Sequence, residues 1–490
     1  MKERKAVYYT SKEIAERGEN NIPEEFILSS HLIYSSPATL SYNSPGAKGF
    51  GVKRGALSIP GSVMLIISPG CCARNTSDIS RMSEYENRFF YLTMDETDIV
   101  TGRHLKKIPE AVAEIVKILK KKPSVVMLCA TCADALLGTD FERVSRKAEE
   151  YAAVKVRPCY MYALTREGSK PPMTALRESI YSLLEKRERR ADSVNLIGYF
   201  AESEKTSELF KLLRRAGVRK INEIAACRNI DEFYKMSEAN FNIVLNPEAA
   251  YAAAEMSEKL GLPYIELKRF YSTERVYSQY RAFFKAALLE VSADEYYEKQ
   301  KNKDLDFKEK YKDLRVSIGE CINANPFELA LALSELGLRV VEIFALVSKE
   351  SFPYIKRLAK ISPETRIFCN QDPSMYFYEP EGEVDISLGA DAAYYRKNIP
   401  NIPFNEDIQP FGFDAIAKLY KSIEKAMTGD NVEKPEEKRQ IRMGKGCYSK
   451  GPKGFKSILT PFAPDQSGAS AVFFGPEGKF RFIVFSHAAD

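Results

Sequence analysis

The chain of 490 residues contains no tryptophan and only three histidines, His31, His104 and His487. Histidines so few and so scattered argue against a histidine-rich metal site. No apolar run reaches the roughly 20 residues that a membrane-spanning helix needs. The N-terminal Met-Lys-Glu-Arg-Lys carries both signs of charge and is not followed by an apolar segment, which is unlike a secretory signal. We therefore expect a cytoplasmic protein without a membrane partner.

Neither sign of charge is in large excess. Lysine and arginine number 72, aspartate and glutamate 67, and the net charge is +5, so the composition gives no case for nucleic acid. The chain also lacks a Gly-x-x-x-x-Gly-Lys-Ser/Thr segment, and we expect that it does not hydrolyse ATP itself. The nine cysteines are therefore the main candidates for functional residues. In a reducing compartment they favour metal ligation or redox chemistry over disulfides.

Short apolar runs alternate with amphipathic stretches along most of the chain, which predicts parallel sheets with crossover helices. We predict an α/β fold of three tandem Rossmann-like domains at residues 1–190, 191–300 and 301–430. Residues 431–490 are predicted as a linker and a C-terminal extension. The predicted strands include residues 63–68, 124–129, 194–200, 241–245, 314–319, 339–346, 365–369 and 480–485. The predicted helices include residues 105–120, 141–152, 205–216, 247–260 and 326–336.

Two of the predicted strands end at cysteines. Ile-Ile-Ser-Pro-Gly-Cys-Cys at residues 66–72 breaks at Pro-Gly and places Cys71 and Cys72 in the loop. The glycine leaves room for a bulky cluster, although burial is the simpler interpretation of Cys72 taken alone. Cys132 follows the strand at 124–129 and opens a helix, whose N-terminus favours a thiolate. Cys129 is expected to point back into the sheet, which leaves a dithiol redox pair as the weaker alternative.

The order of these segments resembles the nitrogenase component 1 family, which includes tetrapyrrole reductases. Family members place a Gly-Cys loop first, then an acidic stretch, then a Thr-Cys that opens a helix. The acidic stretch here is Glu-Thr-Asp-Ile-Val-Thr-Gly at residues 96–102, between Cys71 and Thr131-Cys132. The resemblance covers roughly residues 40–420. It implies that Cys71, Cys132 and Cys72 are the ligands of an iron–sulfur cluster.

Two departures from the family limit what the resemblance implies. Tyr42 stands where nitrogenase subunits have a further cluster cysteine, ahead of a loop at residues 45–49. We therefore expect a 4Fe–4S cluster shared between two subunits, and not the eight-iron P-cluster. Asn246 stands where nitrogenase binds its molybdenum–iron cofactor through cysteine, and the third domain has no histidine, so no such cofactor is expected. Asn246 itself fits a helix N-cap.

The resemblance implies a nitrogenase-like oxidoreductase component 1. It would receive electrons from a separate ATP-dependent iron protein and pass them through an oxygen-labile cluster to a small-molecule substrate that the sequence does not identify. A homodimer, or a heterotetramer with a related subunit, is the expected assembly. One alternative is a non-catalytic scaffold for metallocluster assembly, and another is a redox-silent protein that binds a small ligand. Residues 461–487 are similar to the opening of a second component 1 module.

The remaining cysteines lack partners at metal-ligand spacing, and we interpret most of them as structural. Cys227 and Cys321 stay as outside candidates because they fall near predicted domain edges. This group consists of Cys159, Cys227, Cys321, Cys369 and Cys447.

Overall fold

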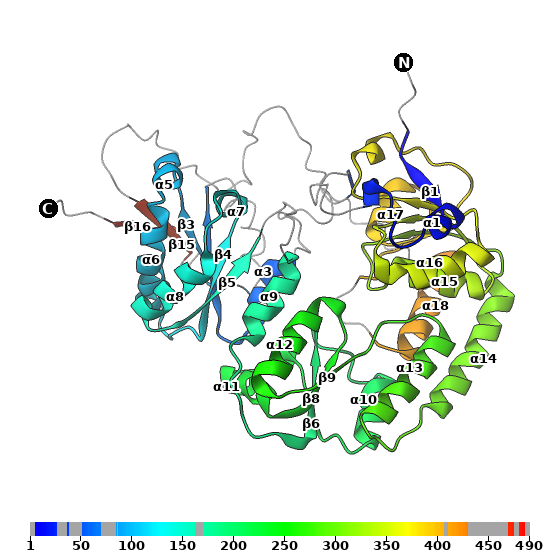
Figure 1. Ribbon diagram of the computed structural model, residues 1–490, viewed down its shortest axis with the longest axis horizontal. Coiled ribbons are helices and arrows are strands. Elements are labelled where there is room, and N and C mark those ends of the chain that lie inside the picture. The colour runs from blue at the N-terminus through cyan, green and yellow to red at the C-terminus, as the bar shows by residue number, and fades with distance from the viewer. Residues whose placement is uncertain are drawn as a thin grey trace.

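The computed structural model describes residues 5–26, 37–38, 51–69, 85, 87–161, 170–405, 410–429, 469–474 and 480–485. These residues form three α/β units, each built on its own sheet. Figure 1 shows the first unit on the left, the second below and the third on the right. The predicted class, tandem α/β units with parallel sheets, is confirmed. None of the helices in the described part of the chain combines the length and the apolar character that crossing a bilayer requires.

The first sheet has the strand order β16-β15-β3-β2-β4-β5. Its parallel strands are β2 (Val63–Ser68), β3 (Phe89–Thr93), β4 (Val125–Ala130) and β5 (Lys155–Tyr160). Every residue of β2 and β4 is buried, because elements of the fold pack on both faces of the sheet. Strands buried on both faces have continuous apolar sequences, which is why both were predictable.

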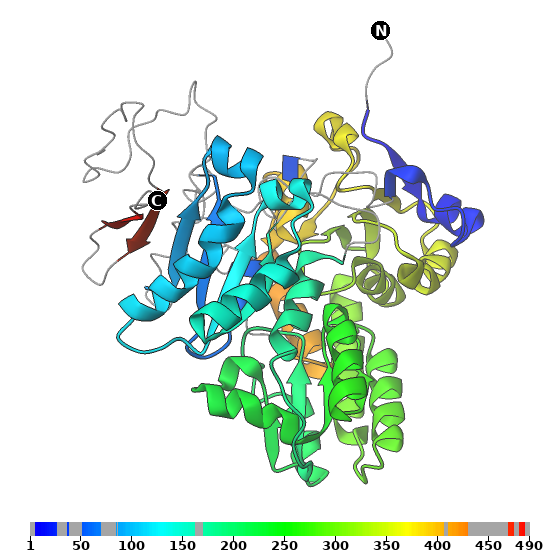
Figure 2. The same ribbon diagram turned by 60° about the vertical axis from the view of Figure 1, so that its left-hand side comes forward.

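The helices of the first unit divide between the two faces of this sheet. α6 (His104–Ile118) and α8 (Phe141–Ala152) lie side by side on one face, as Figure 2 shows. α3 (Gly51–Ala56) and α9 (Pro172–Tyr181) pack on the other. Two short helices follow β3 and β4, namely α5 (Glu96–Thr101) and α7 (Cys132–Leu137). Each face therefore has its own apolar cluster.

The second unit is a smaller parallel sheet with the order β7-β6-β8-β9. Its strands are β6 (Arg190–Ile197), β7 (Lys220–Asn222), β8 (Ala239–Val244) and β9 (Tyr264–Glu266). Its helices are α10 (Glu208–Arg215), α11 (Ile230–Tyr234), α12 (Ala250–Leu260) and α13 (Thr273–Ala286). The predicted strands and helices of this unit are confirmed, with boundaries that differ by a few residues.

The third sheet has the order β1-β12-β11-β10-β13-β14. Its strands are β1 (Tyr8–Thr10), β10 (Arg315–Gly319), β11 (Arg339–Phe344), β12 (Arg366–Phe368), β13 (Ile386–Leu388) and β14 (Asn401–Ile402). Its helices are α1 (Ser11–Arg17), α14 (Asp294–Tyr311), α15 (Pro326–Glu335), α16 (Phe352–Ile361), α17 (Ala390–Tyr395) and α18 (Phe413–Thr428). The predicted start of this unit, residue 301, lies inside α14.

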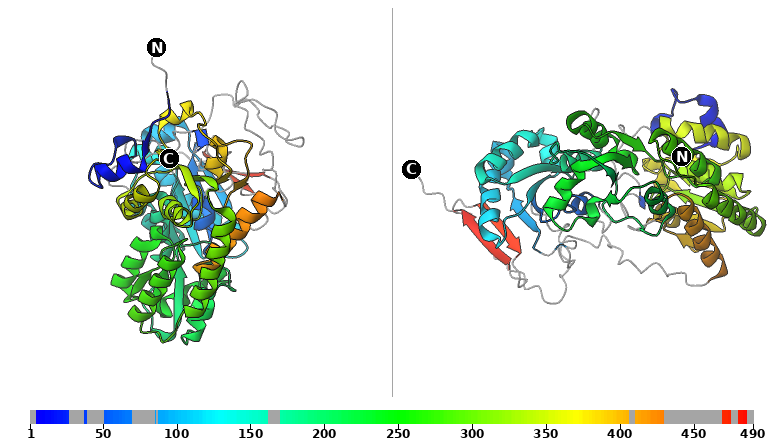
Figure 3. Two further views of the ribbon diagram at one scale, coloured as in Figure 1. Left: turned by 90° about the vertical axis from the view of Figure 1, so that its right-hand side faces the viewer. Right: turned by 90° about the horizontal axis from the view of Figure 1, so that it is seen from below.

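The two chain ends depart from the predicted domain ranges. β1 pairs antiparallel with β12, so the N-terminal residues complete the third unit. The predicted range 1–190 had assigned them to the first unit. β15 (Ala469–Phe474) and β16 (Phe480–Phe485) form an antiparallel hairpin that extends the first sheet beside β3. Figure 3 shows this hairpin at the outer edge of the first unit. Both pairings join segments hundreds of residues apart, which no local pattern indicates.

The second and third units are joined where the N-termini of α10 and α18 meet. The Glu208 carboxylate accepts from the Phe413 N–H at 2.6 Å and from the Asp414 N–H at 3.2 Å. The Asp414 carboxylate accepts in return from the Glu208 N–H at 2.9 Å, so each acidic residue caps the other's helix. Tyr280 donates to Glu208 as well. Burial, followed by the effect of Asp414, raises the pKa of Glu208 to about 8.

Gly412 precedes this contact with φ +66°, and a Cβ there would overlap Glu208 Oε1 and the Tyr280 hydroxyl. We predict that Gly412→Ala lowers the free energy of unfolding by about 3 kcal/mol or more, through backbone strain and overpacking together. Gly429→Ala at the other end of α18 is the matched control, because φ is +76° but no atom lies within 4 Å. It should lose only about 1 kcal/mol. Denaturant titration measures both, and equal losses would contradict the predicted overlap.

Candidate functional site

Each parallel sheet has a point where its strand order reverses. In the first sheet the chain runs from β2 to β3 on one side and then to β4 on the other. The equivalent points lie between β6 and β8 in the second sheet and between β10 and β13 in the third. Ligands of doubly wound sheets bind outside the carboxyl ends of the strands at such switch points. The loops after β2 and β4 are therefore the first place to examine.

Cys132 lies at the first switch point. β4 ends at Ala130, and Cys132 is the first residue of α7 with a half-buried side chain. This is the strand-to-helix turn that the sequence predicted. Cys71 and Cys72 lie outside the described residues, two and three positions beyond Pro69. The described ranges alone contain no group of three or more His, Cys, Asp or Glu residues that could hold a metal ion.

Cys129 is not at the switch point but in the sheet. It is fully buried and lies opposite Cys159 of β5. A hydrogen bond between the two thiols, together with burial, raises the pKa of Cys159 well above its usual value. A protonated thiol is a poor nucleophile and a poor metal ligand. This supports the expectation that Cys129 points back into the sheet, and it weakens the dithiol redox alternative.

Two buried hydroxyls end the strands beside this turn. Ser68 is the last residue of β2 and Thr131 follows β4, and their side chains are 1% and 2% exposed. Within the described residues neither hydroxyl oxygen has a hydrogen-bond partner. The sulfides and thiolates of an iron–sulfur cluster accept hydrogen bonds. Donors without acceptors, next to a cysteine, fit such a cluster.

The acidic stretch at residues 96–102 has a structural role. Asp98 and Asp95 form a capping box that begins α5. The buried Asp98 carboxylate also accepts from Lys107 at 2.8 Å and from Arg103 at 3.1 Å. Burial alone would raise the pKa of Asp98, but these hydrogen bonds outweigh it and hold the pKa below its usual value. The Asp98 carboxylate is therefore held in the wall that α5 and α6 form and is not open to a ligand.

His104 joins this wall to α7, a contact that sequence reasoning missed. Its Nδ1 lies 3.0 Å from the Asp98 carbonyl oxygen and its Nε2 lies 3.2 Å from an Asp134 carboxylate oxygen. Both neighbours offer acceptor oxygens, so the protonated ring donates to both of them, whereas a neutral ring donates to only one. Burial alone would lower the pKa of His104, but the bonds to Asp134 and Asp98 raise it overall. No spacing in the sequence pairs these two residues.

The second switch point carries no thiol. Asn246 follows β8, and its side chain accepts from the Glu248 N–H at 3.0 Å, which confirms the predicted N-cap. Beside it the buried Arg177 guanidinium donates to the Gly198 carbonyl at 2.6 and 2.9 Å and to the Glu248 carboxylate at 2.9 Å. Arg177 belongs to α9, so this group of contacts ties the first unit to the second. The amide of Asn246 is already used by the backbone.

The other described cysteines are dispersed. Burial raises the pKa of Cys227 to about 11 and that of Cys369 to about 12. The Cys369 thiol donates to the Glu25 carbonyl at 2.6 Å. Cys321 is half-buried at the third switch point, where its N–H donates to Asp391. None of these thiols approaches Cys132 closely enough to form a ligand group, and Cys447 lies outside the described residues.

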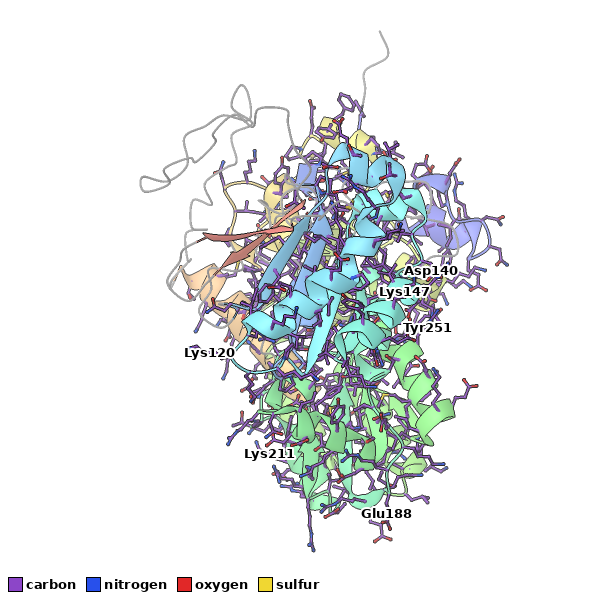
Figure 4. The ribbon with its side chains drawn as sticks, turned by 90° about the vertical axis from the view of Figure 1, so that its left-hand side faces the viewer. Lys120, Asp140, Lys147, Glu188, Lys211 and Tyr251 are labelled. Atoms are coloured by element: carbon purple, nitrogen blue, oxygen red, sulfur yellow. The ribbon has the colours of Figure 1, made fainter. Side chains whose placement is uncertain are left out.

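A groove of about 920 Å³ runs along the outer edge of the first unit. α8, α9 and α12 line it, and its walls carry both acidic and basic side chains, such as Glu149 and Arg157. In Figure 4, Asp140 at the N-cap of α8, Lys147 of α8 and Tyr251 of α12 lie along this side of the molecule. Described cysteines do not line the groove, but Ala130 and Asp134 do, so the groove reaches the turn that carries Cys132.

The fold and the site together define a class, that of three-unit α/β proteins with a cysteine at the switch point of the first sheet. A family model for nitrogenase component 1 type oxidoreductases matches residues 48–427. The chain therefore belongs to this family, which confirms the resemblance. A solved structure described as nitrogenase Cp1 at pH 6.5 superposes with a TM-score of 0.62 at 16% identity, covering 82% of this chain and 95% of that one.

Curated relatives also match the chain by sequence. The nitrogenase molybdenum-iron protein alpha chain of Methanosarcina barkeri is 27% identical over 226 residues, which is 45% of this chain and 42% of that protein. The nitrogenase iron-molybdenum cofactor biosynthesis protein NifE of Clostridium pasteurianum is 28% identical over 43% of this chain and 46% of its own length. The chain thus spans less than half the length of these relatives. NifE of Sinorhizobium fredii is 23% identical over 423 residues, which is 80% of this chain and 83% of that protein.

We predict that the His104–Asp134 pair makes stability depend on pH. A histidine whose pKa is raised in the folded state gives its full contribution to stability when the pH is below its ordinary pKa of 6.5. This contribution is lost as the pH rises through the pKa of the folded state. His104→Gln should therefore lose about 2 kcal/mol at pH 5.5 and less at pH 9. Asp134→Asn removes the charge that raises the pKa of His104. The pH range in which His104 stabilises the fold should therefore move to lower values. Unfolding titrations across pH that give parallel curves for wild type and His104→Gln would contradict the pairing.

Proposed function

We propose that the chain binds an iron–sulfur cluster at the first switch point, with Cys132 and Cys71 as ligands and Cys72 as a third. The observation that carries this proposal is the position of Cys132. It opens α7 directly beyond β4, while β2, the neighbouring parallel strand, leads after Pro69 to Cys71. Carboxyl ends of parallel strands meet at one edge of a sheet. No more than about 7 Å of extended chain separates Cys71 from Pro69.

The chemistry of this site follows from its own residues. Cys132 and Cys71 supply thiolates, which are the ligands that hold the iron of an iron–sulfur cluster. Such a cluster holds and passes single electrons. Two or three thiolates per chain are fewer than the four that a 4Fe–4S cluster takes, so we expect a second subunit to complete the set. A homodimer and a heterotetramer with a related subunit both satisfy this count.

The role supported best is that of a scaffold for metallocluster assembly in the cytoplasm. The relatives aligned over the largest share of this chain are named as iron-molybdenum cofactor biosynthesis proteins. A scaffold must release its cargo, so a thiolate in the second unit that binds the cargo permanently would be a disadvantage. Asn246 serves there as a helix cap, and a neutral amide is a poor ligand for iron. We expect no resident molybdenum–iron cofactor.

The second candidate is a reductase component. The family comprises oxidoreductases, and one relative is a molybdenum-iron protein alpha chain. In this role a separate ATP-hydrolysing iron–sulfur protein would deliver electrons, because this chain lacks a phosphate-binding Gly-x-x-x-x-Gly-Lys-Ser/Thr segment. The cluster would then reduce a small-molecule substrate.

We predict that Cys132→Ala loses the cluster. In chain purified and reconstituted without oxygen, iron and acid-labile sulfide should fall to half or less of the wild-type content, because one of few thiolates is removed. Cys369→Ala is the matched control, since that thiol is fully buried and its sulfur donates to a backbone carbonyl. It should keep the wild-type content. Iron absent from reconstituted wild-type chain would overturn the proposal.

The two roles differ in the fate of the iron. If the chain is a scaffold, protein loaded with labelled iron should transfer it to cofactor-deficient nitrogenase component 1, and the label should leave this chain. If it is a reductase, the label stays while a tetrapyrrole or similar substrate is reduced in the presence of the iron protein and MgATP. Retained stoichiometric molybdenum, or ammonia formed from dinitrogen, would contradict both roles.

A further inference from the structure

Ser68 and Thr131 end two columns of side chains on the same face of the first sheet. Side chains alternate between faces along a strand. Met64 and Ile66 of β2, and Met127 and Cys129 of β4, all pack in the apolar cluster beneath α3 and α9. Ser68 is two positions beyond Ile66, and Thr131 is two beyond Cys129. Both hydroxyls therefore belong to the face that α3 and α9 cover.

The register places the two residues level with each other. β2 and β4 pair in parallel from Val63 opposite Val126 to Ile66 opposite Cys129, with a constant offset. The same offset puts Ser68 opposite Thr131. Neighbouring strands lie about 4.8 Å apart, so the two hydroxyls are close neighbours at the edge where Cys132 opens α7.

Neither hydroxyl is used by the described part of the protein. Both oxygens are buried and have no hydrogen-bond partner there, not even each other. Leaving a buried polar group unsatisfied costs about 1–3 kcal/mol. Apolar residues at both positions would continue the columns without this penalty. Two such hydroxyls at one switch point therefore call for an acceptor that is not part of the sheet.

We infer that Ser68 and Thr131 donate hydrogen bonds to sulfur atoms of the cluster bound at this switch point and thereby raise its reduction potential. This rests on the proposed function, and it assigns positioning residues beyond the thiolate ligands. The sulfurs of such a cluster carry negative charge, so hydroxyl donors form charge-assisted bonds with them. Hydrogen bonds to sulfur help to set the potentials of iron–sulfur clusters. Reduction increases the charge on sulfur, so the donors favour the reduced state.

The test measures the midpoint potential of the reconstituted full chain. Ser68→Ala and Thr131→Val should each keep iron and sulfide but move the potential to more negative values, and the double variant should move it further. Thr131→Ser keeps a hydroxyl and should remain near wild type. Ser145→Ala is the matched control, because Ser145 of α8 is also buried with an unpartnered hydroxyl but lines the groove between α8, α9 and α12. Its potential should not change.

The outcomes separate this inference from the proposed function. Wild-type chain that binds no iron overturns both. Wild-type chain with a cluster whose potential is the same in Ser68→Ala, Thr131→Val and Ser145→Ala overturns this inference alone. If Ser68→Ala or Thr131→Val binds no cluster, the melting temperature of the apoprotein decides. An unchanged melting temperature means that the hydroxyl served the cluster. A lower melting temperature means that the hydroxyl is bonded within the protein, which contradicts the inference.

Discussion

The parallel pairing of β2 with β4 is the constraint on which the site depends. It sets the register from Val63 opposite Val126 to Ile66 opposite Cys129, and through it the level at which both strands leave the sheet. Cys132 reaches the switch point because β4 ends there. The pairing is stable because both strands are apolar, except for Ser68 at the end of β2, and are buried on both faces. Polar residues occur only where the strands end.

A second set of contacts holds the three units in one arrangement. Arg177 connects α9 of the first unit with Gly198 and Glu248 of the second. Glu208 and Asp414 exchange backbone hydrogen bonds between the second and third units. Arg177 and Glu208 are buried and each makes several hydrogen bonds, so loss of either side chain would leave buried polar partners unsatisfied.

The three switch points carry different chemistry. The first has Cys132 and two hydroxyls, the second an asparagine that caps a helix, and the third Cys321 and a buried Asp391 that accepts from the Glu320 and Cys321 backbone N–H groups. The first combines a cysteine with two buried hydroxyls that have no partner among the described residues. In a family of oxidoreductases, a chain with this distribution is suited to holding one cluster in its first unit. It has no matching thiolate in its second.

The sequence by itself determined the elements and the family. Residues 63–68 and 141–152 were predicted with their observed bounds, since a continuous apolar run and an amphipathic repeat are local properties. Asn246 was predicted as a cap, because a short polar side chain before Pro-Glu has a local use. Only the tertiary structure decided that β1 completes the third sheet, that His104 meets Asp134, and that Ile66 of β2 lies opposite Cys129 of β4. These contacts join residues that are distant in the chain. They are created by strand register and helix packing, which leave no signal in the local sequence.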